Sequence, residues 1–245
     1  MEGQQLTKLS IYTSKDIKEI CKFWSRNNYF DGITPAKLKI HLLWKYNSQF
    51  TTLWIVKKEG RIIGSCGRIE TRLVSRGKFI CNAPWGIDSL VDASLDKRER
   101  RFVFLKVFRS ANREGHQRKE PEVGFCFPNQ VVKDAYLRMG YLDTPIFNQY
   151  SKDIDREISS DDEFTFTVIK RFDYRWDKIW GAISRNFSMS VFRDHVYLNW
   201  RYIQNPDRKY IVLLVKIRNQ IKGYFVLREK EICGRKVGFI VDFLA

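Results

Sequence analysis

The amino-acid sequence predicts a mixed α/β fold, built as one nearly complete unit followed by a partial second copy. Over residues 10–150 the hydrophobic period changes in the order helix, helix, strands, helix, strand, helix. This order is typical of a mixed sheet with an antiparallel front and a crossover connection at the back. Short strings from this region also recur about 156 to 159 residues later. We therefore expect domains at 1–150 and 164–245, joined by a polar, acidic linker at 151–163.

Two helices open the first unit. In residues 14–28 apolar side chains recur at helical spacing, and Ser14 is the expected N-cap. Residues 34–46 show a second helical pattern, with Thr34 at the expected cap and Pro35 at the first helical position.

The period then changes to that of strands. Strands are predicted over residues 51–57, 61–74, 78–92 (interrupted near Pro84) and 121–127. Helices are predicted over residues ~98–113 and 130–139, and Gly140 lies where a helix-terminating glycine is expected. In the second copy we expect helical material at 173–204 and strands at 209–217, 221–230 and 236–244.

The internal repeat is indicated by matches that occur in the same order at nearly constant offset. They pair LWKY (43–46) with NWRY (199–202), Val56-Lys57 and Gly64 with Val215-Lys216 and Gly223, SRN (25–27) with SRN (184–186), and IDSL (87–90) with IVDF (240–243). The second copy stops after this last strand. We expect the resulting sheet edge to be covered by close packing of the two units or by a homodimer.

Composition points to an anionic partner. The 44 Lys and Arg residues exceed the 28 Asp and Glu residues by 16, which suits a nucleic acid, a membrane surface or a phosphate-rich cofactor. No apolar run approaches the ~18 residues of a membrane helix, and the N-terminus lacks the pattern of a signal peptide. We therefore expect a cytoplasmic protein. The five cysteines and three histidines show no metal-ligand spacing, so no metal site is expected.

The segment GFCFPN at 124–129, followed by Tyr136, Gly140 and Tyr141, resembles the GNAT acyl-CoA N-acyltransferase superfamily. The resemblance covers nearly the whole chain and is nearest to members that carry two such domains. It implies transfer of an acetyl or other acyl group from acyl-CoA to a small amine, an amino sugar or a peptide amine. It further implies that Asn129 contacts the pantetheine arm of CoA and that Tyr136 protonates the departing thiolate.

The chemistry also calls for a base and for a donor to the carbonyl oxygen of the thioester. The resemblance implies that this donor is a backbone N–H of the strand at 87–92, which makes Leu90 and Val91 the candidates. Asp88 and Glu70 are the candidate bases. Each carboxylate could equally be an ordinary surface or paired charge.

The sequence departs from the family pattern at the pyrophosphate loop. That pattern, Arg/Gln-x-x-Gly-x-Gly/Ala, lets backbone amides approach the phosphates. The corresponding side chains here are Lys97, Arg98, Arg100, Arg101 and Phe102, of which Arg100 and Phe102 replace small residues. Either the four cationic side chains hold the diphosphate of CoA instead, or the CoA site is lost.

Two other functions therefore stay open. One is a transferase resembling the FemABX group, tandem GNAT-fold proteins that take an aminoacyl group from tRNA, which the positive charge would suit. The other is a non-catalytic binding module that kept the fold and lost the donor site.

Overall fold

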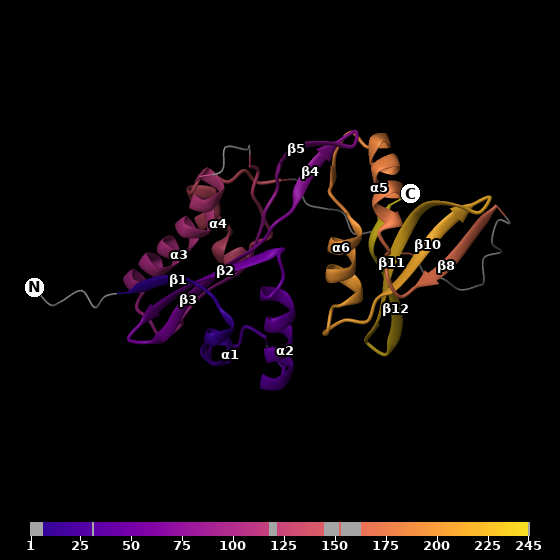
Figure 1. Cartoon of the computed structure of the whole chain (residues 1–245). Coiled ribbons are helices and arrows are strands. Elements are labelled where there is room, and N and C mark those ends of the chain that lie inside the picture. Colours follow the sequence, from indigo (N-terminus) through magenta and orange to yellow (C-terminus); the bar gives the residue numbers. More distant parts are fainter. Residues whose placement is uncertain (1–6, 31, 118–121, 145–151, 153–162, 245) are drawn as a thin grey trace, which may run out of the picture.

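A computed structural model describes residues 7–30, 32–117, 122–144, 152 and 163–244 (Figure 1). Almost all of the expected linker at 151–163 lies outside these residues, so the division into domains at 1–150, 151–163 and 164–245 stays a prediction. We call the part before residue 145 the first unit and the part from residue 163 the second unit. The described residues form three sheets.

The first unit contains a five-stranded mixed sheet in the order β1-β2-β3-β6-β7. Its strands are β1 (Lys8–Ile11), β2 (Thr51–Lys58), β3 (Arg61–Ile69), β6 (Trp85–Val91) and β7 (Phe125–Cys126). All neighbours are antiparallel except β6 and β7, which are parallel. The expected α/β class is confirmed, and so is the strand break near Pro84.

Helices cover both faces of this sheet (Figure 1). Helices α1 (Ile17–Arg26) and α2 (Pro35–Tyr46) pack on one face, and α3 (Lys97–Gln117) and α4 (Gln130–Arg138) pack on the other. Alternate side chains of β2 enter the two cores: Ile55 packs with the first pair of helices, and Val56 packs with the second pair.

The helix starts follow capping chemistry. Thr34 caps α2 as expected, because its hydroxyl accepts the backbone N–H of Lys37. The expected cap at Ser14 is wrong. A short 3₁₀ turn, Ser14–Asp16, precedes α1, and the Asp16 carboxylate accepts both the backbone N–H and the hydroxyl of Thr13.

The strand expected over 61–74 is wrong beyond Ile69. A separate strand, β4 (Arg72–Ser75), pairs with β5 (Lys78–Asn82) and with β9 (Ser190–Val191) of the second unit. Apolar residues resume at Leu73 and Val74, but β4 takes its partners from a different sheet. A two-residue break therefore redirects the chain toward the second unit.

The second unit contains an antiparallel four-stranded sheet in the order β12-β11-β10-β8. Its strands are β8 (Phe164–Ile169), β10 (Ile211–Ile217), β11 (Gln220–Ile232) and β12 (Arg235–Leu244). The helical material expected at 173–204 is not continuous. It consists of α5 (Arg175–Ile183), a 3₁₀ turn (Ser184–Asn186), β9, α6 (His195–Leu198) and a π-helical turn (Asn199–Ile203).

Both sheets contain the same irregularity at the same repeat position. In the first unit Val56 pairs with Gly64 and the register then shifts at Lys57. In the second unit Val215 pairs with Gly223 and the register shifts at Lys216. Each residue lies 159 positions after its counterpart (56 to 215, 64 to 223), so the two hairpins have one geometry.

The register also corrects the expected alignment of the last strand by one residue. Ser65 pairs with Leu90, and Tyr224, which lies 159 positions after Ser65, pairs with Leu244. Leu90 is therefore equivalent to Leu244, and Asp88 and Asp242 each lie two residues before this pair. The sequence comparison had placed Asp88 opposite Val241.

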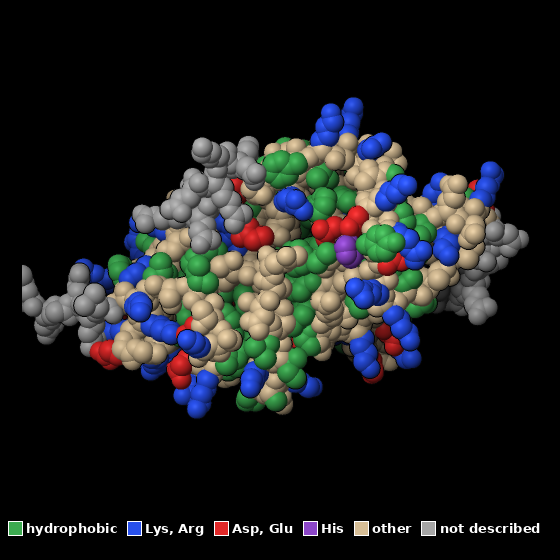
Figure 2. All heavy atoms as spheres, viewed as in Figure 1, with side chains coloured by type: hydrophobic (Ala, Val, Ile, Leu, Met, Phe, Trp, Pro, Cys, Tyr) green, Lys and Arg blue, Asp and Glu red, His purple; other side chains and the backbone are tan. Residues whose placement is uncertain are grey.

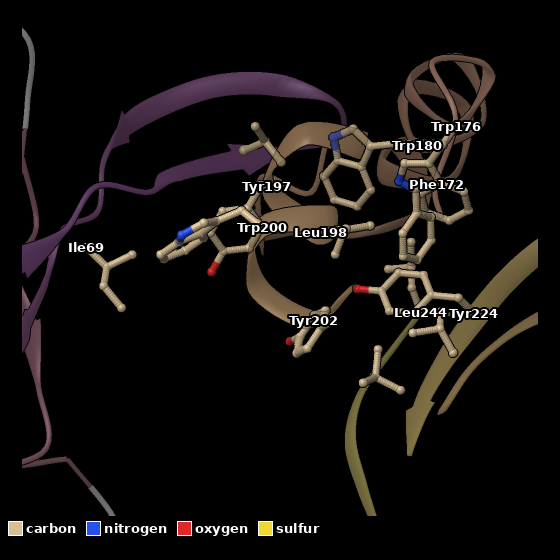
Figure 3. Close-up of a cluster of buried hydrophobic side chains, with 13 residues drawn as sticks. Ile69, Phe172, Trp176, Trp180, Tyr197, Leu198, Trp200, Tyr202, Tyr224 and Leu244 are labelled. Atoms are coloured by element: carbon tan, nitrogen blue, oxygen red, sulfur yellow. The ribbon is translucent and has the colours of Figure 1, made fainter. Parts of the chain in front are cut away.

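The two units share a hydrophobic core (Figure 3). Most of its buried side chains come from the second unit, including Trp176, Trp180 and Tyr224, and Ile69 of β3 faces this cluster from the side of Trp200. Together with the pairing of β4 and β9, this core joins the two units closely, as expected. No described helix is long and apolar enough to cross a membrane.

Candidate active site

The edge of β6 that faces β7 is largely unpaired by strands in the described part of the chain. Pairing is limited to Trp85 with Phe125 and Gly86 with Cys126. Next to these pairs lies a small pocket between the sheet and α3 and α4, lined by residues that include Gly86, Cys126 and Tyr136. It has room for about one water molecule.

Tyr136, the predicted acid, points from α4 toward β6. Its side chain is only 5% exposed. Its hydroxyl lies 3.5 Å from the hydroxyl of Ser89 on β6, which in turn lies 3.3 Å from the thiol of Cys66 on β3. Edge-to-face contacts with Phe108 and Tyr141 fix the ring.

Burial raises the pKa of the Tyr136 phenol above its ordinary value, and the hydrogen bond with Ser89 opposes this rise. The phenol is therefore protonated at neutral pH. A general acid needs this form, because it must still hold the proton that it will donate.

The two candidate backbone donors point in opposite directions. The N–H of Asp92 donates to the carbonyl of Ile63 on β3. Because N–H direction alternates along a strand, Leu90 also points to β3 and Val91 points to the opposite edge. The expectation for Leu90 is therefore wrong, and Val91 is the amide that faces the unpaired edge of β6.

Asp88 lies on the other side of β6 from Ser89, among side chains of α2 and the segment after α1. Its carboxylate accepts hydrogen bonds from Tyr46 and Tyr29 and forms an ion pair with Lys45 at 2.7 Å. Burial alone would raise the pKa of Asp88, but Lys45 and the Tyr46 hydroxyl outweigh it and lower the pKa below its usual range. A carboxylate held so firmly ionised is a weak base, so this geometry favours a structural role.

Glu70, the other candidate base, forms an ion pair with Arg68 at 3.0 Å. Arg68 is only 3% exposed and also binds Glu122 at 2.8 Å and the carbonyl of Ala111. This cluster ties β3 to the end of α3 and to the segment that leads into β7. Glu70 therefore neutralises a buried cation.

Asn129 occupies the N-cap of α4. Its side-chain oxygen accepts the backbone N–H of Val132 at 3.2 Å. The position at the end of β7 is the one expected from the sequence, and the side chain serves the helix there.

Backbone N–H groups of the loop between β6 and α3 donate hydrogen bonds to protein oxygens. The N–H groups of Ser94 and Leu95 donate to Asp92, and the N–H of Ala93 donates to the side chain of Asn27. The N–H groups of Glu99 and Arg100 donate to Asp96. Asp96 is therefore the N-cap of α3 and places a carboxylate at this helix terminus.

The basic residues predicted to bind phosphate lie on the first turn of α3. All of them are exposed: Lys97, Arg98, Arg100, Arg101 and, beside them, Phe102. Figure 2 shows many Lys and Arg side chains at the end of the molecule where α3 and β1 lie. Among the described residues, no group of His, Cys, Asp and Glu could hold a metal ion.

The structure thus places Tyr136 on the face of the sheet that α3 and α4 cover, and Asp88 among side chains of the opposite face. Val91 turns its amide toward the β7-facing edge of β6. Sequence reasoning missed Ser89 and Asp96. Ser89 carries no motif that could have identified it. Asp96 could have been found, because an Asp three residues before a Glu at a helix start is a capping pattern.

Solved structures resemble this chain. An aminoglycoside N-acetyltransferase, AAC(6')-Iy, solved with CoA, superimposes with a TM-score of 0.51 at 11% identity, covering 63% of this chain and 99% of that one. The chain has the GNAT acetyltransferase fold. Glucosamine-6-phosphate N-acetyltransferase from Arabidopsis thaliana (TM-score 0.47, 14% identity, 61% and 99% covered) was also found. So was a predicted acetyltransferase with acetyl-CoA from Clostridium acetobutylicum (0.45, 12%, 60% and 96%). The sequence matches no family model, and no curated protein is significantly similar to it.

Two features lie along β6 and the loop that follows it. Tyr136 lies against Ser89 of β6, and the Val91 amide points toward the edge of β6 that faces β7. In the loop between β6 and α3 and at the helix start, the N–H groups of residues 93, 94, 95, 99 and 100 donate to protein oxygens, and the Asp96 carboxylate lies at the N-terminus of α3.

Proposed function

We propose that this chain is an N-acyltransferase that moves an acyl group from a pantetheine thioester to an amine. The observation that carries the proposal is the position of the Tyr136 hydroxyl, buried beside Ser89 of β6, the strand whose Val91 amide points toward its unpaired edge. A protonated phenol and a backbone donor at one strand edge are the two groups that thioester cleavage needs.

In this mechanism the amine nitrogen forms a bond to the carbonyl carbon, and the bond from carbon to sulfur breaks. The Val91 N–H stabilises the negative charge that develops on the carbonyl oxygen. The Tyr136 hydroxyl gives its proton to the departing sulfur, and the proton that the amine nitrogen loses on becoming an amide passes through water and restores the phenol. Asp88 is not assigned as the base, because its pKa is lowered by Lys45 and Tyr46.

The acceptor is proposed as an amine on a small molecule, an amino sugar or a peptide. The relative with the TM-score above 0.5 is named as an aminoglycoside N-acetyltransferase, and that name supports an amino-sugar acceptor as the first to test. Acetyl-CoA is the first donor to assay, because that relative was solved with CoA.

The test is acetyl transfer from acetyl-CoA and from acetyl-pantetheine to a panel of amines, with Tyr136→Phe beside the wild type. The variant keeps the ring packing and removes the proton, so kcat should fall about 100-fold. Tyr174→Phe, at an exposed tyrosine of the second unit, is the matched control. Equal rates for the wild type and Tyr136→Phe would show that Tyr136 is not the general acid.

A non-catalytic binding module is the second candidate. It is favoured by the carboxylate of Asp96 at the phosphate position and by the small size of the pocket beside Tyr136. A folded protein that transfers no acyl group from any thioester, or from aminoacyl-tRNA, would favour this function over the first.

A further inference from the structure

The first turn of α3 presents a compact surface of unpaired charge, formed by Lys97, Arg98, Arg100, Arg101 and Phe102. We call this surface the basic turn. Its four cations are exposed and have no described partner among the residues that the structure covers. Glu99, the acidic residue of the same turn, is already paired with Lys58 at 3.0 Å.

The backbone beneath the basic turn offers a compact diphosphate few amides. Five amides of the loop and helix start, those of residues 93, 94, 95, 99 and 100, already donate to protein oxygens. A phosphate bound at the start of α3 would also lie close to the Asp96 carboxylate, and the two negative charges would repel each other. The exposed cations are therefore open to a ligand that approaches from outside the loop.

Two cations that flank the loop are already paired. Arg26 and Arg61 both bind Asp92, at 2.8 and 2.9 Å. The four cations at the start of α3 match a small acidic surface. Binding of a nucleic-acid backbone, which usually follows a longer basic surface, is the alternative that the test below separates.

The exposed side chain of Phe102 favours a protein as the acidic partner. This side chain is 57% exposed at the end of the basic turn, and the ammonium of Lys106 lies 5.7 Å from its ring. Arginine and aromatic side chains are the residue types enriched at protein interfaces.

The basic turn also lies next to the candidate site. β6 ends at Val91, whose amide faces the thioester edge, and α3 begins at Lys97. We propose that the acyl donor is an acidic carrier protein that docks on the basic turn and extends its acyl-pantetheine arm along β6, in place of acyl-CoA. This rests on the acyl transfer proposed above. The arm carries its phosphate at the carrier surface and has no adenosine diphosphate to fit into the closed loop.

The test compares binding of the full chain to the holo form of an acidic acyl carrier protein, to the same protein without its pantetheine arm, and to CoA. Calorimetry at low and moderate salt is the readout, so no transfer activity is needed. The holo carrier should bind about tenfold more tightly than CoA, and Arg98→Glu/Arg101→Glu should weaken its binding by about tenfold or more. Lys222→Glu/Lys230→Glu, two exposed lysines of β11, makes the same charge change and should leave binding intact.

The variant Asp96→Ser distinguishes binding of CoA at the start of α3 from binding of the carrier protein on the basic turn. Serine keeps the N-cap and removes the charge, so CoA should bind about tenfold more tightly while binding of the carrier stays the same. Tighter binding of CoA than of the carrier in the wild type would overturn the proposal. So would binding of tRNA, without carrier binding, that the Arg98→Glu/Arg101→Glu variant loses. The acyl-transfer proposal itself fails on a different result, namely that Tyr136→Phe leaves transfer unchanged.

Discussion

Trp44 and Trp200 stack on each other across the boundary between the two units, with ring centroids 5.5 Å apart and planes inclined by 20°. Each indole N–H donates to the backbone carbonyl of the other residue, at 3.1 and 3.4 Å. The two residues are equivalent in the repeat (44 to 200, an offset of 156). Such reciprocal contacts between equivalent residues are those of a two-fold axis, so the units meet about a local pseudo-two-fold axis.

Replacing Trp200 with alanine should strongly destabilise the protein. Trp200 is buried in the shared core, and removing a buried aromatic side chain costs about 3–5 kcal/mol. Chemical unfolding followed by fluorescence and circular dichroism checks the loss. Because Trp200 joins the two units, we also expect the unfolding transitions reported by fluorescence and by circular dichroism to occur at different denaturant concentrations. Coincident transitions with unchanged stability would contradict the role of this pair, and Tyr174→Ala at an exposed aromatic is the control.

Gly64→Ala should be poorly tolerated. A β-carbon at Gly64 would lie 2.4 Å from a methyl carbon of Val103 on α3, and a β-branched side chain on a helix has little freedom to move. We expect a loss of about 1–3 kcal/mol in the free energy of unfolding. Gly238→Ala, in β12, would meet no atom within 4 Å and should change stability little. Similar unfolding midpoints for the two variants would show that α3 can shift away from β3.

Arg68→Met should leave the carboxylates of Glu70 and Glu122 without their buried cation. Breaking a buried ion pair from one side costs about 3–5 kcal/mol, and this pair also holds the segment that enters β7. Thermal unfolding measures the cost. Arg175→Met removes an exposed ion pair with Asp173 and should leave the melting temperature nearly unchanged. Equal melting temperatures for both variants would argue against the importance of the buried cluster.

Asp92 should contribute a pH-dependent part of the stability. Burial acts to raise its pKa, but hydrogen bonds from Ser94, Arg26 and Arg61 outweigh burial and lower the pKa to about 2. The folded pKa lies below the ordinary value of 3.8, so this stabilisation is present above about pH 4 and is lost as the pH falls toward 2. Between about pH 4 and 2 the free energy of unfolding should therefore fall less steeply with pH in Asp92→Asn than in the wild type. Parallel curves for variant and wild type would contradict the assignment.

Ser89→Ala should slow acyl transfer without unfolding the protein. The Ser89 hydroxyl is the hydrogen-bond partner of Tyr136, and losing one such bond should lower kcat by about three- to tenfold. Ser89→Thr retains a hydroxyl and should recover part of the rate. A full rate in Ser89→Ala would mean that the packing of Phe108 and Tyr141 is enough to position the phenol.

Local patterns were sufficient to predict most of the elements. Thr34 with Pro35 identified the start of α2, and the break at Pro84 separated β5 from β6. The strand at 61–74 was not divided correctly: the polar residues 70–72 interrupt it, but that Leu73 and Val74 pair with β5 and β9 is not visible in the local sequence. Pairing between distant segments is not visible in a local hydrophobic period.

The candidate site could also be predicted only where it depends on residues close together in the sequence. The spacing of Asn129 and Tyr136 depends on one loop and one helix, and the structure keeps both at the β6–β7 edge. Choosing between Leu90 and Val91 required the hydrogen bond of Asp92 to β3. Ser89 became a candidate only when the fold placed it against Tyr136, 47 residues away in sequence.

The tyrosine that holds Asp88 has a counterpart in the second unit. Tyr46 donates to Asp88, and the equivalent Tyr202 donates to the equivalent Asp242 at 3.0 Å. The described part of the second unit has this carboxylate but no neighbour that corresponds to Tyr136. The two units thus supply an internal comparison: a Tyr–Asp pair that both contain belongs to the scaffold that they share, which agrees with a structural role for Asp88.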